Sequence, residues 1–359
     1  MIDTRVRLAG MAEPAQRTTQ PSRPADDDFA RLADPYRREL LAHCYRMLGS
    51  THDAEDLVQE TYLRAWRAYD NFENRSSLRT WLYRIATNVC LSAIEGRGRR
   101  PLPTGLGQPS SDPTGELVSQ PEVPWLEPMP DAMVAADPSD PATIVASRES
   151  IRLALVAALQ HLPPRQRAVL VLRDVLQWRA AEVAEVLGAT TIAVNSILQR
   201  ARAQLAQARL SEDDVVEPDD PALRSVLDRY VEALVNKDIT TIVTLFTADA
   251  VWEMPPFTGW YYGPDDIGRL IATQCPAGPQ ELRLVPTRAN GQPAFGVYLL
   301  GPDGDFHPFQ LHVLTVGAAG ISHVASFFDL TLFATFGLPE TVRADSGVGA
   351  SAVAAPALG

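Results

Sequence analysis

The chain contains very little lysine and very little cysteine. Lys237 is the single lysine among 32 basic residues, so arginine carries almost all of the positive charge. The three cysteines, Cys44, Cys90 and Cys275, are too few and too widely spaced for a disulfide framework or a thiolate zinc site. They favour a reducing compartment, and we expect a cytoplasmic protein without a metal ion or other cofactor.

Long apolar runs are also missing. No uninterrupted apolar stretch approaches the roughly 20 residues that cross a bilayer, and the first residues are polar and rich in proline and arginine, unlike a secretory signal. We therefore expect no membrane partner, and flexible tails over residues 1–27 and 341–359. The 359 residues, of which 46% are hydrophobic, suffice for two or three domains that each bury a core.

Positive charge is absent from one stretch and concentrated in another. Residues 101–146 hold seven acidic residues, ten prolines and no basic residue, which predicts an extended acidic linker without a sustained helix. Residues 147–210 hold nine basic and four acidic residues, although the formal net charge of the chain is -12. Because phosphate contact depends on the local field, residues 147–210 are the candidate nucleic-acid-binding block. A second linker is predicted at 211–220.

Residues 28–100 carry two helical patterns. In the first, Asp53–Tyr69, the apolar residues including Trp66 form one stripe at helical spacing, which we expect to face inward. Asp56, Gln59 and Glu60 lie together on the opposite face, where they form either a partner-binding patch or an ordinary solvated surface.

The second helical pattern runs from about residue 77 to 94. We expect four side chains on its outer side: Arg79, Tyr83, Arg84 and Asn88. Arginine beside an exposed aromatic ring suits unpaired bases, because stacking and charge act together. An ordinary exposed face is the alternative.

The segment "AEVAEVLGATTIAVNSILQRARAQL" (Ala181–Leu205) has the pattern of a helix-turn-helix. Gly188 makes the turn, and Thr190 or Thr191 caps the second helix. Its outward positions, which would reach base edges and phosphates in a major groove, are Asn195, Ser196, Gln199, Arg200 and Arg202. A purely structural helical hairpin is the alternative.

These motifs resemble those of a known family. "HDAEDLVQETYLRAWRAYDNF" and "TWLYRIATN" are similar to region 2 of the extracytoplasmic-function (group 4) sigma factors, and "LPPRQRAVLVLRDV" with the helix-turn-helix is similar to region 4. The resemblance implies that the chain binds core RNA polymerase (β′ clamp and β subunits) and promoter DNA. It implies polymerase contacts by Asp56, Leu57, Gln59 and Glu60, and contacts with the -10 element by the loop at 71–77 and the outer face of the 77–94 helix. It also implies a path for the linker through the polymerase channel.

The resemblance assigns the outward side chains of the second helix of the helix-turn-helix to the -35 element. Many relatives carry basic residues where this chain has Asn195 and Ile197. A relative's -35 sequence preference therefore does not transfer directly.

Residues 221–340 change in character. Two helices are followed by runs suited to strands, at 251–254, 282–287, 294–300, 310–316 and 321–328, which predict an α+β domain with a mainly antiparallel sheet. The start of this block resembles SnoaL-like domains, which share a cone-shaped fold like that of nuclear transport factors. The whole chain resembles actinobacterial sigma factors with a fused SnoaL-like domain, of the type called sigma factor G. The expected fold class is multidomain: two all-α sigma domains and a C-terminal α+β cone.

Such cones often enclose an apolar pocket. The candidate lining residues are Trp252, Met254, Phe257, Trp260, Phe309, His312, His323 and Asp329. They form either a small-molecule site or simply a core with hydrogen-bonded histidines. The histidines do not show metal-ligand spacing on one element, so no metal site is expected. The leading interpretation is a sigma factor that performs no chemistry and whose cone modulates its activity. The alternative is a ligand-responsive protein whose cone is an active cyclase or isomerase.

Overall fold

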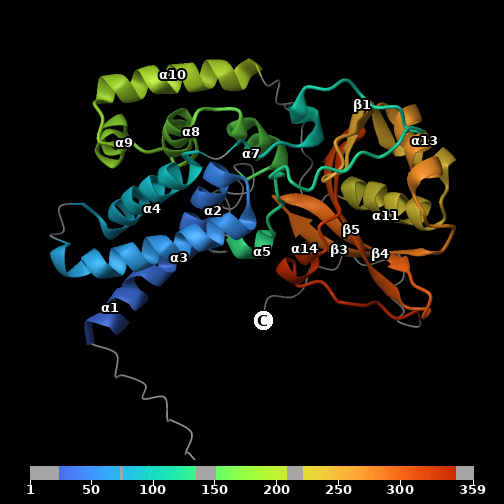
Figure 1. The fold of residues 1–359 in the computed structure, drawn as a ribbon, viewed down its shortest axis with the longest axis horizontal. Coiled ribbons are helices and arrows are strands. Elements are labelled where there is room, and N and C mark those ends of the chain that lie inside the picture. Colours follow the sequence, from blue (N-terminus) through green and yellow to red (C-terminus); the bar gives the residue numbers. More distant parts are fainter. Residues whose placement is uncertain (1–23, 73–75, 97, 135–150, 208–220, 345–359) are drawn as a thin grey trace, which may run out of the picture.

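The computed structural model describes residues 24–72, 76–96, 98–134, 151–207 and 221–344. Two groups of helices lie side by side in one half of the molecule, and a sheet with its own helices forms the other half (Figure 1). The linker predicted at 211–220 lies outside the described residues, as do most of both predicted tails and the end of the 101–146 linker.

The first helical group confirms the two helices predicted between residues 53 and 94. Gly49 ends the second of its four helices in the left-handed conformation, with φ of 69°. The side chains of Ser50 and Ser77 cap the next two helices by accepting hydrogen bonds from the backbone N–H three residues on. The helices are α1 (Pro24–Ala33), α2 (Arg37–Leu48), α3 (Thr51–Ala68) and α4 (Leu78–Ile94). Helix α1 thus begins inside the tail expected at 1–27.

The second helical group contains the predicted helix-turn-helix. Gly188 occupies the turn with φ of 59°, and the Thr190 hydroxyl accepts a hydrogen bond from the Ala193 N–H, as predicted for a cap. The last two helices meet at 98°, within the range of helix-turn-helix motifs. The elements are α7 (Leu153–Gln160), α8 (Pro164–Leu170), the π-helical turn η4 (Val171–Val175), α9 (Ala180–Leu187) and α10 (Thr191–Gln207).

The third unit, which we call the cone, contains one six-stranded sheet. Its spatial order is β2-β1-β6-β5-β4-β3, and only the β1–β6 pair is parallel, as expected for a mainly antiparallel sheet. The strands are β1 (Phe246–Glu253), β2 (Trp260–Tyr262), β3 (Leu282–Ala289), β4 (Gln292–Leu300), β5 (Phe306–Gly317) and β6 (Gly320–Phe327). The cone's helices are α11 (Pro221–Val235), α12 (Ile239–Leu245), α13 (Pro264–Gln274) and α14 (Thr331–Thr335). The sequence patterns missed β2, α13 and α14.

The sheet is buried on both faces, because alternate residues of a strand point to opposite sides. On β5, Leu314 joins the core under α11 and α13. Leu311 and Val313 join a cluster that also contains residues of α2, α3, α4 and the helix-turn-helix block. The cone is therefore packed against the helical groups by a continuous apolar contact.

Residues 98–134, which we call the strap, connect the first helical group with the cone. The strap contains the short helices η3 (Pro103–Leu106) and α5 (Asp131–Val134) and otherwise consists of turns and extended segments. This part of the predicted 101–146 linker holds no long helix, and residues 135–146 lie outside the described residues. Its backbone hydrogen-bonds along the cone, where the N–H of Thr258 donates to the Val118 carbonyl at 2.9 Å. That docking was not predicted, since nothing in the composition of the strap specifies a partner.

Candidate functional site

The face of α3 that is expected to bind polymerase is largely open. The side chains of Asp56 and Gln59 are exposed, whereas Leu57 and Glu60 are half-buried. Glu60 forms an ion pair with Arg64 at 2.6 Å.

The same helix also exposes two large apolar side chains, Leu63 (48% exposed) and Trp66 (45% exposed). The prediction that Trp66 points inward is wrong. Phe29 of α1 packs on Tyr62 and Tyr69. It therefore covers the side of the apolar stripe that holds these two tyrosines, whereas Trp66 remains exposed.

The outer face predicted for α4 is divided. Arg84 and Asn88 are exposed, as expected. Tyr83 is fully buried, so its predicted outward position is wrong: its ring packs against Trp178 of the helix-turn-helix block, with centroids 5.1 Å apart. Arg79 is half-buried and lies over the same tryptophan, while its guanidinium donates to the Glu39 carboxylate at 2.7 Å. The second helical group therefore covers half of the candidate -10 face.

A buried arginine holds the two helical groups together. The Arg167 guanidinium in α8 is almost fully buried, and it donates hydrogen bonds to the Met47 carbonyl at the end of α2 and to the Gln160 carbonyl at the end of α7. Both carbonyls belong to helix C-termini, where positive charge is favourable. Burial lowers the pKa of Arg167 to about 10, which leaves it charged at neutral pH.

The candidate -35 face of α10 is uncovered. Its side chains Asn195, Ser196, Gln199 and Arg200 are all exposed, as the helical spacing predicts. Arg202 is exposed too, but its guanidinium already binds the Asp174 carboxylate at 2.7 Å. The sequence patterns missed Ile192, whose 81% exposure at the start of the same helix puts an apolar group beside these polar ones.

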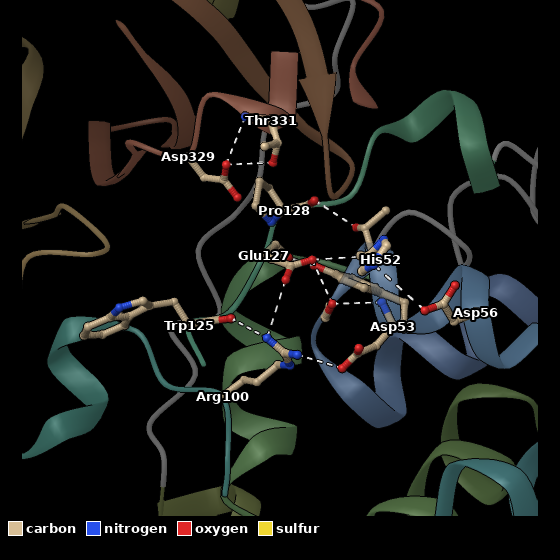
Figure 2. A network of polar contacts seen from close by, with 12 residues as sticks. His52, Asp53, Asp56, Arg100, Trp125, Glu127, Pro128, Asp329 and Thr331 are labelled. Atoms are coloured by element: carbon tan, nitrogen blue, oxygen red, sulfur yellow. Dashed lines mark hydrogen bonds and ion pairs between the residues drawn. The ribbon is translucent and has the colours of Figure 1, made fainter. Parts of the chain in front are cut away.

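The strap docks on the first turn of α3, one helical turn from Asp56 (Figure 2). The Glu127 carboxylate accepts hydrogen bonds from the Ser50 hydroxyl at 2.8 Å and from the His52 N–H at 3.4 Å. A carboxylate is favoured at this helix N-terminus by the free N–H groups and the helix dipole. Arg100 of the strap also forms an ion pair with Asp53 of α3 at 2.6 Å.

The turn between β3 and β4 contacts all the other parts of the molecule. Asn290 and Gly291 both have positive φ, 57° and 72°, as a two-residue hairpin turn of this kind requires. The Asn290 side chain is fully buried and donates to the Tyr45 hydroxyl at 2.8 Å and to the Ile151 carbonyl at 2.6 Å, and it accepts from the Met129 N–H at 2.9 Å. These partners belong to α2, to the segment before α7 and to the strap. We call Asn290–Gln292 the clasp.

Two further contacts strengthen the clasp. The Asp131 carboxylate of the strap accepts the Gly291 N–H at 2.7 Å, and the Gln292 side chain accepts the Leu153 N–H at the start of α7 at 3.1 Å. The Asn-Gly pair at residues 290–291 is a strong sequence signal for a hairpin, but no local pattern specifies what the turn contacts.

The cone contains an apolar cavity of about 220 Å³. Five of the predicted lining residues line it: Trp252, Met254, Phe257, Phe309 and His312.

Three predicted lining residues do not line the cavity. Trp260 pairs with Glu253 and His323 with Val251, so both lie on the sheet face opposite Trp252. Trp260 donates to the Gln108 carbonyl, and His323 pairs with Glu253 at 2.7 Å.

The third, Asp329, is exposed, and its carboxylate accepts hydrogen bonds from the N–H and the hydroxyl of Thr331. Asp329 and His312 are therefore not brought together in the cavity. Burial also lowers the pKa of His312 to about 3, so its ring is neutral at physiological pH. Among the described residues, no cluster of three or more potential ligands could hold a metal ion, and no single helix is both long and apolar enough to cross a membrane.

Known proteins match the chain in the order of its parts. The family model for Sigma-70 region 2 matches residues 32–100, and the model for Sigma-70 region 4 matches residues 152–205. The chain is 62% identical over 325 residues to the ECF RNA polymerase sigma factor SigG of Mycobacterium tuberculosis, covering 89% of this chain and 87% of the relative. The chain belongs to the ECF sigma factors.

A second relative extends the likeness to the cone. The ECF sigma factor SigJ of M. tuberculosis is 31% identical over 242 residues, or 66% of this chain and 69% of SigJ. The crystal structure of SigJ matches with a TM-score of 0.58 at 24% identity and covers 87% of this chain and 99% of that one, so the whole three-part fold is shared. Sigma factors bind core RNA polymerase and promoter DNA, and the chain has both helical modules that this requires.

Proposed function

We propose that this sigma factor binds the polymerase clamp through Asp56, Leu57, Gln59 and Glu60 of α3, and that its cone holds the two DNA-reading modules closed until polymerase separates them. The proposal assigns -10 contacts to α4 and -35 contacts to α10. The observation that carries it is Asn290, a single buried side chain of the cone that hydrogen-bonds region 2, region 4 and the strap together.

The positions of Tyr83 and Trp178 support a closed, inactive arrangement. A -10 face that stacks bases needs exposed aromatic surface, and here Tyr83 is fully buried beneath Trp178. Two reading modules that serve separate promoter elements must also move apart. Transcription therefore requires opening, and each contact that favours the closed arrangement reduces the fraction of the sigma factor that is competent to bind.

The cone stabilises the closed arrangement from both sides. Through the clasp it reaches α2 and the start of α7, and through the strap it reaches the first turn of α3 beside the polymerase face. A regulator fused to the chain in this way needs no separate inhibitory protein. The cone is proposed to act by binding alone, because the exposed Asp329 and the neutral His312 do not form an acid–base pair.

The test is the affinity of the full chain for core polymerase after Asn290→Ala. The variant removes three side-chain hydrogen bonds that exist only in the closed arrangement, each worth about 1 kcal/mol. We expect the apparent affinity, measured by fluorescence anisotropy, to rise by up to about a hundredfold, with a matching rise in run-off transcription at low sigma concentration. Asn236→Ala, at an exposed asparagine of the same domain, is the matched control. An unchanged or weaker affinity for Asn290→Ala would refute the closed-state proposal.

A further inference from the structure

The cavity in the cone is lined almost entirely by carbon. It lies between the sheet and α13, and its volume of about 220 Å³ exceeds the roughly 150 Å³ of an apolar protein cavity that takes up benzene. None of its lining residues is Asp, Glu, Lys or Arg. A charged ligand would lose its hydration there without gaining a counter-charge. The lining therefore favours an uncharged molecule of about ten non-hydrogen atoms.

Two buried nitrogens at this cavity have no hydrogen-bonding partner among the described residues. They are the Trp252 indole nitrogen and the Nε2 atom of His312. Both side chains line the cavity, both are at least 97% buried, and their rings meet edge to face with centroids 5.3 Å apart. Buried donors are rarely left unpaired, because each costs about 1–3 kcal/mol.

The contact of His312 with Tyr230 is the basis on which we assign the histidine tautomer, and with it the hydrogen-bonding groups that face the ligand. The Tyr230 hydroxyl lies 2.9 Å from His312 Nδ1, and burial raises the pKa of this tyrosine well above its ordinary value, so the phenol keeps its proton. When the phenol donates to Nδ1, the proton of the neutral imidazole is on Nε2. The indole of Trp252 can only donate. The two unpaired groups are then both donors, and they call for an acceptor.

We propose that the cone is a binding site for an uncharged, mainly apolar molecule with one carbonyl oxygen, which accepts hydrogen bonds from Trp252 and His312. The strap forms part of the wall, since Leu117 lines the cavity and the Gln274 amide of α13 donates to the Gly115 carbonyl at 2.9 Å. A ligand thus contacts the segment that docks on α3. The site needs the cone and the strap wall but not the contacts between the two helical groups, so it stands or falls independently of the closed-state proposal.

Three bicyclic probes of similar size test the ligand class with the full chain. They are 1-tetralone, which carries a carbonyl; tetralin, which lacks it; and 1-naphthoate, which is charged. Isothermal titration calorimetry should show that 1-tetralone binds about tenfold more tightly than tetralin, and that 1-naphthoate does not bind. Equal affinity for 1-tetralone and tetralin, stronger binding of 1-naphthoate, or no binding of 1-tetralone up to its solubility would overturn the proposal.

Variants locate the site. Trp252→Phe keeps the aromatic ring but removes the donor, and it should abolish most of the preference for 1-tetralone over tetralin. Trp260→Phe, at a tryptophan on the other face of the sheet, should leave that preference unchanged. A preference that survives in both Trp252→Phe and His312→Phe would show that the carbonyl binds elsewhere.

A readout on the unmodified chain does not depend on the variants folding. Cys275 lines the cavity and is partly exposed, whereas Cys44 and Cys90 are buried. Saturating 1-tetralone should slow the reaction of Cys275 with a thiol reagent at least about fivefold, since few cavities are unoccupied at saturation. An unchanged rate at a concentration that saturates the calorimetric signal would contradict binding in this cavity.

Discussion

The two helices expected to read promoter DNA differ in their surroundings. Helix α10 presents Asn195, Ser196 and Gln199 to solvent, whereas α4 has Tyr83 buried under Trp178 and Arg79 paired with Glu39. Helix α10 is open to solvent, whereas α4 is half covered by the helical group to which α10 belongs. Under the proposed function, the closed arrangement controls access to the -10 element rather than to the -35 element.

Loss of the buried Arg167 guanidinium should have the largest effect on the difference between α4 and α10. Arg167→Met removes the donor that joins the ends of α2 and α7 and leaves their carbonyls unpaired. We expect the free energy of unfolding, measured by urea denaturation, to fall by about 3 kcal/mol. The summed tryptophan emission should shift to longer wavelength as Trp178 becomes exposed. Arg165→Ala, at an exposed arginine of the same helix, should cost less than about 1 kcal/mol. Equal losses of unfolding free energy in the two variants would mean that Arg167 does not hold the two helical groups together.

Acidification should lower the free energy of unfolding of region 2 and of the cone, and a different buried histidine is responsible in each. Burial lowers the pKa of His43 and the pKa of His312 to about 3. The nearby charge of Arg46 also lowers the pKa of His43. The unfolded chain, with a histidine pKa near 6.5, therefore binds more protons between about pH 3 and 6.5, and stability is lost as the pH falls through that window. The expected slope is about 1.4 kcal/mol per pH unit for each histidine.

Urea denaturation at pH 6.5 and pH 5.0 measures this slope. His312→Phe should remove the contribution of the cone and leave that of His43, which contacts Tyr83 beneath the covered face. The same slope in both proteins would contradict a buried neutral His312.

The smallest effect concerns the uncovered helix. Gln199→Ala and Ser196→Ala should each weaken binding to a -35 duplex by about 1 kcal/mol, because one base contact is lost, and should leave core polymerase affinity unchanged. Electrophoretic mobility shifts with the free chain and with holoenzyme measure this. We expect the same loss in both, since α10 is equally exposed in the closed arrangement. A loss confined to the holoenzyme would show that α10 is not accessible before opening.

The sequence predicts best what depends on local periodicity. The outward residues of α10 and the glycine turn at 188 follow from helical spacing and are confirmed. Tyr83 was misplaced because the ring that buries it, Trp178, lies in another domain and far along the chain.

The cavity shows the same limit. Trp252 and His312 were predicted correctly, but His323 was not, since its pairing with Val251 places it on the sheet face opposite Trp252. Asn290 shows this limit most clearly. The Asn-Gly pair indicates the turn, but no pattern in the sequence indicates the three hydrogen-bonding partners of the Asn290 side chain.

The distance between the two helical groups tests the central claim most directly. Spin labels at Arg37→Cys on α2 and Glu185→Cys on α9, both exposed positions, can be introduced with Cys275→Ser so that only buried cysteines remain. Double electron–electron resonance should give one narrow distance for the free chain, a longer one on binding core polymerase, and a mixture for free Asn290→Ala. One unchanged distance in all three samples would contradict a clasp that polymerase must open.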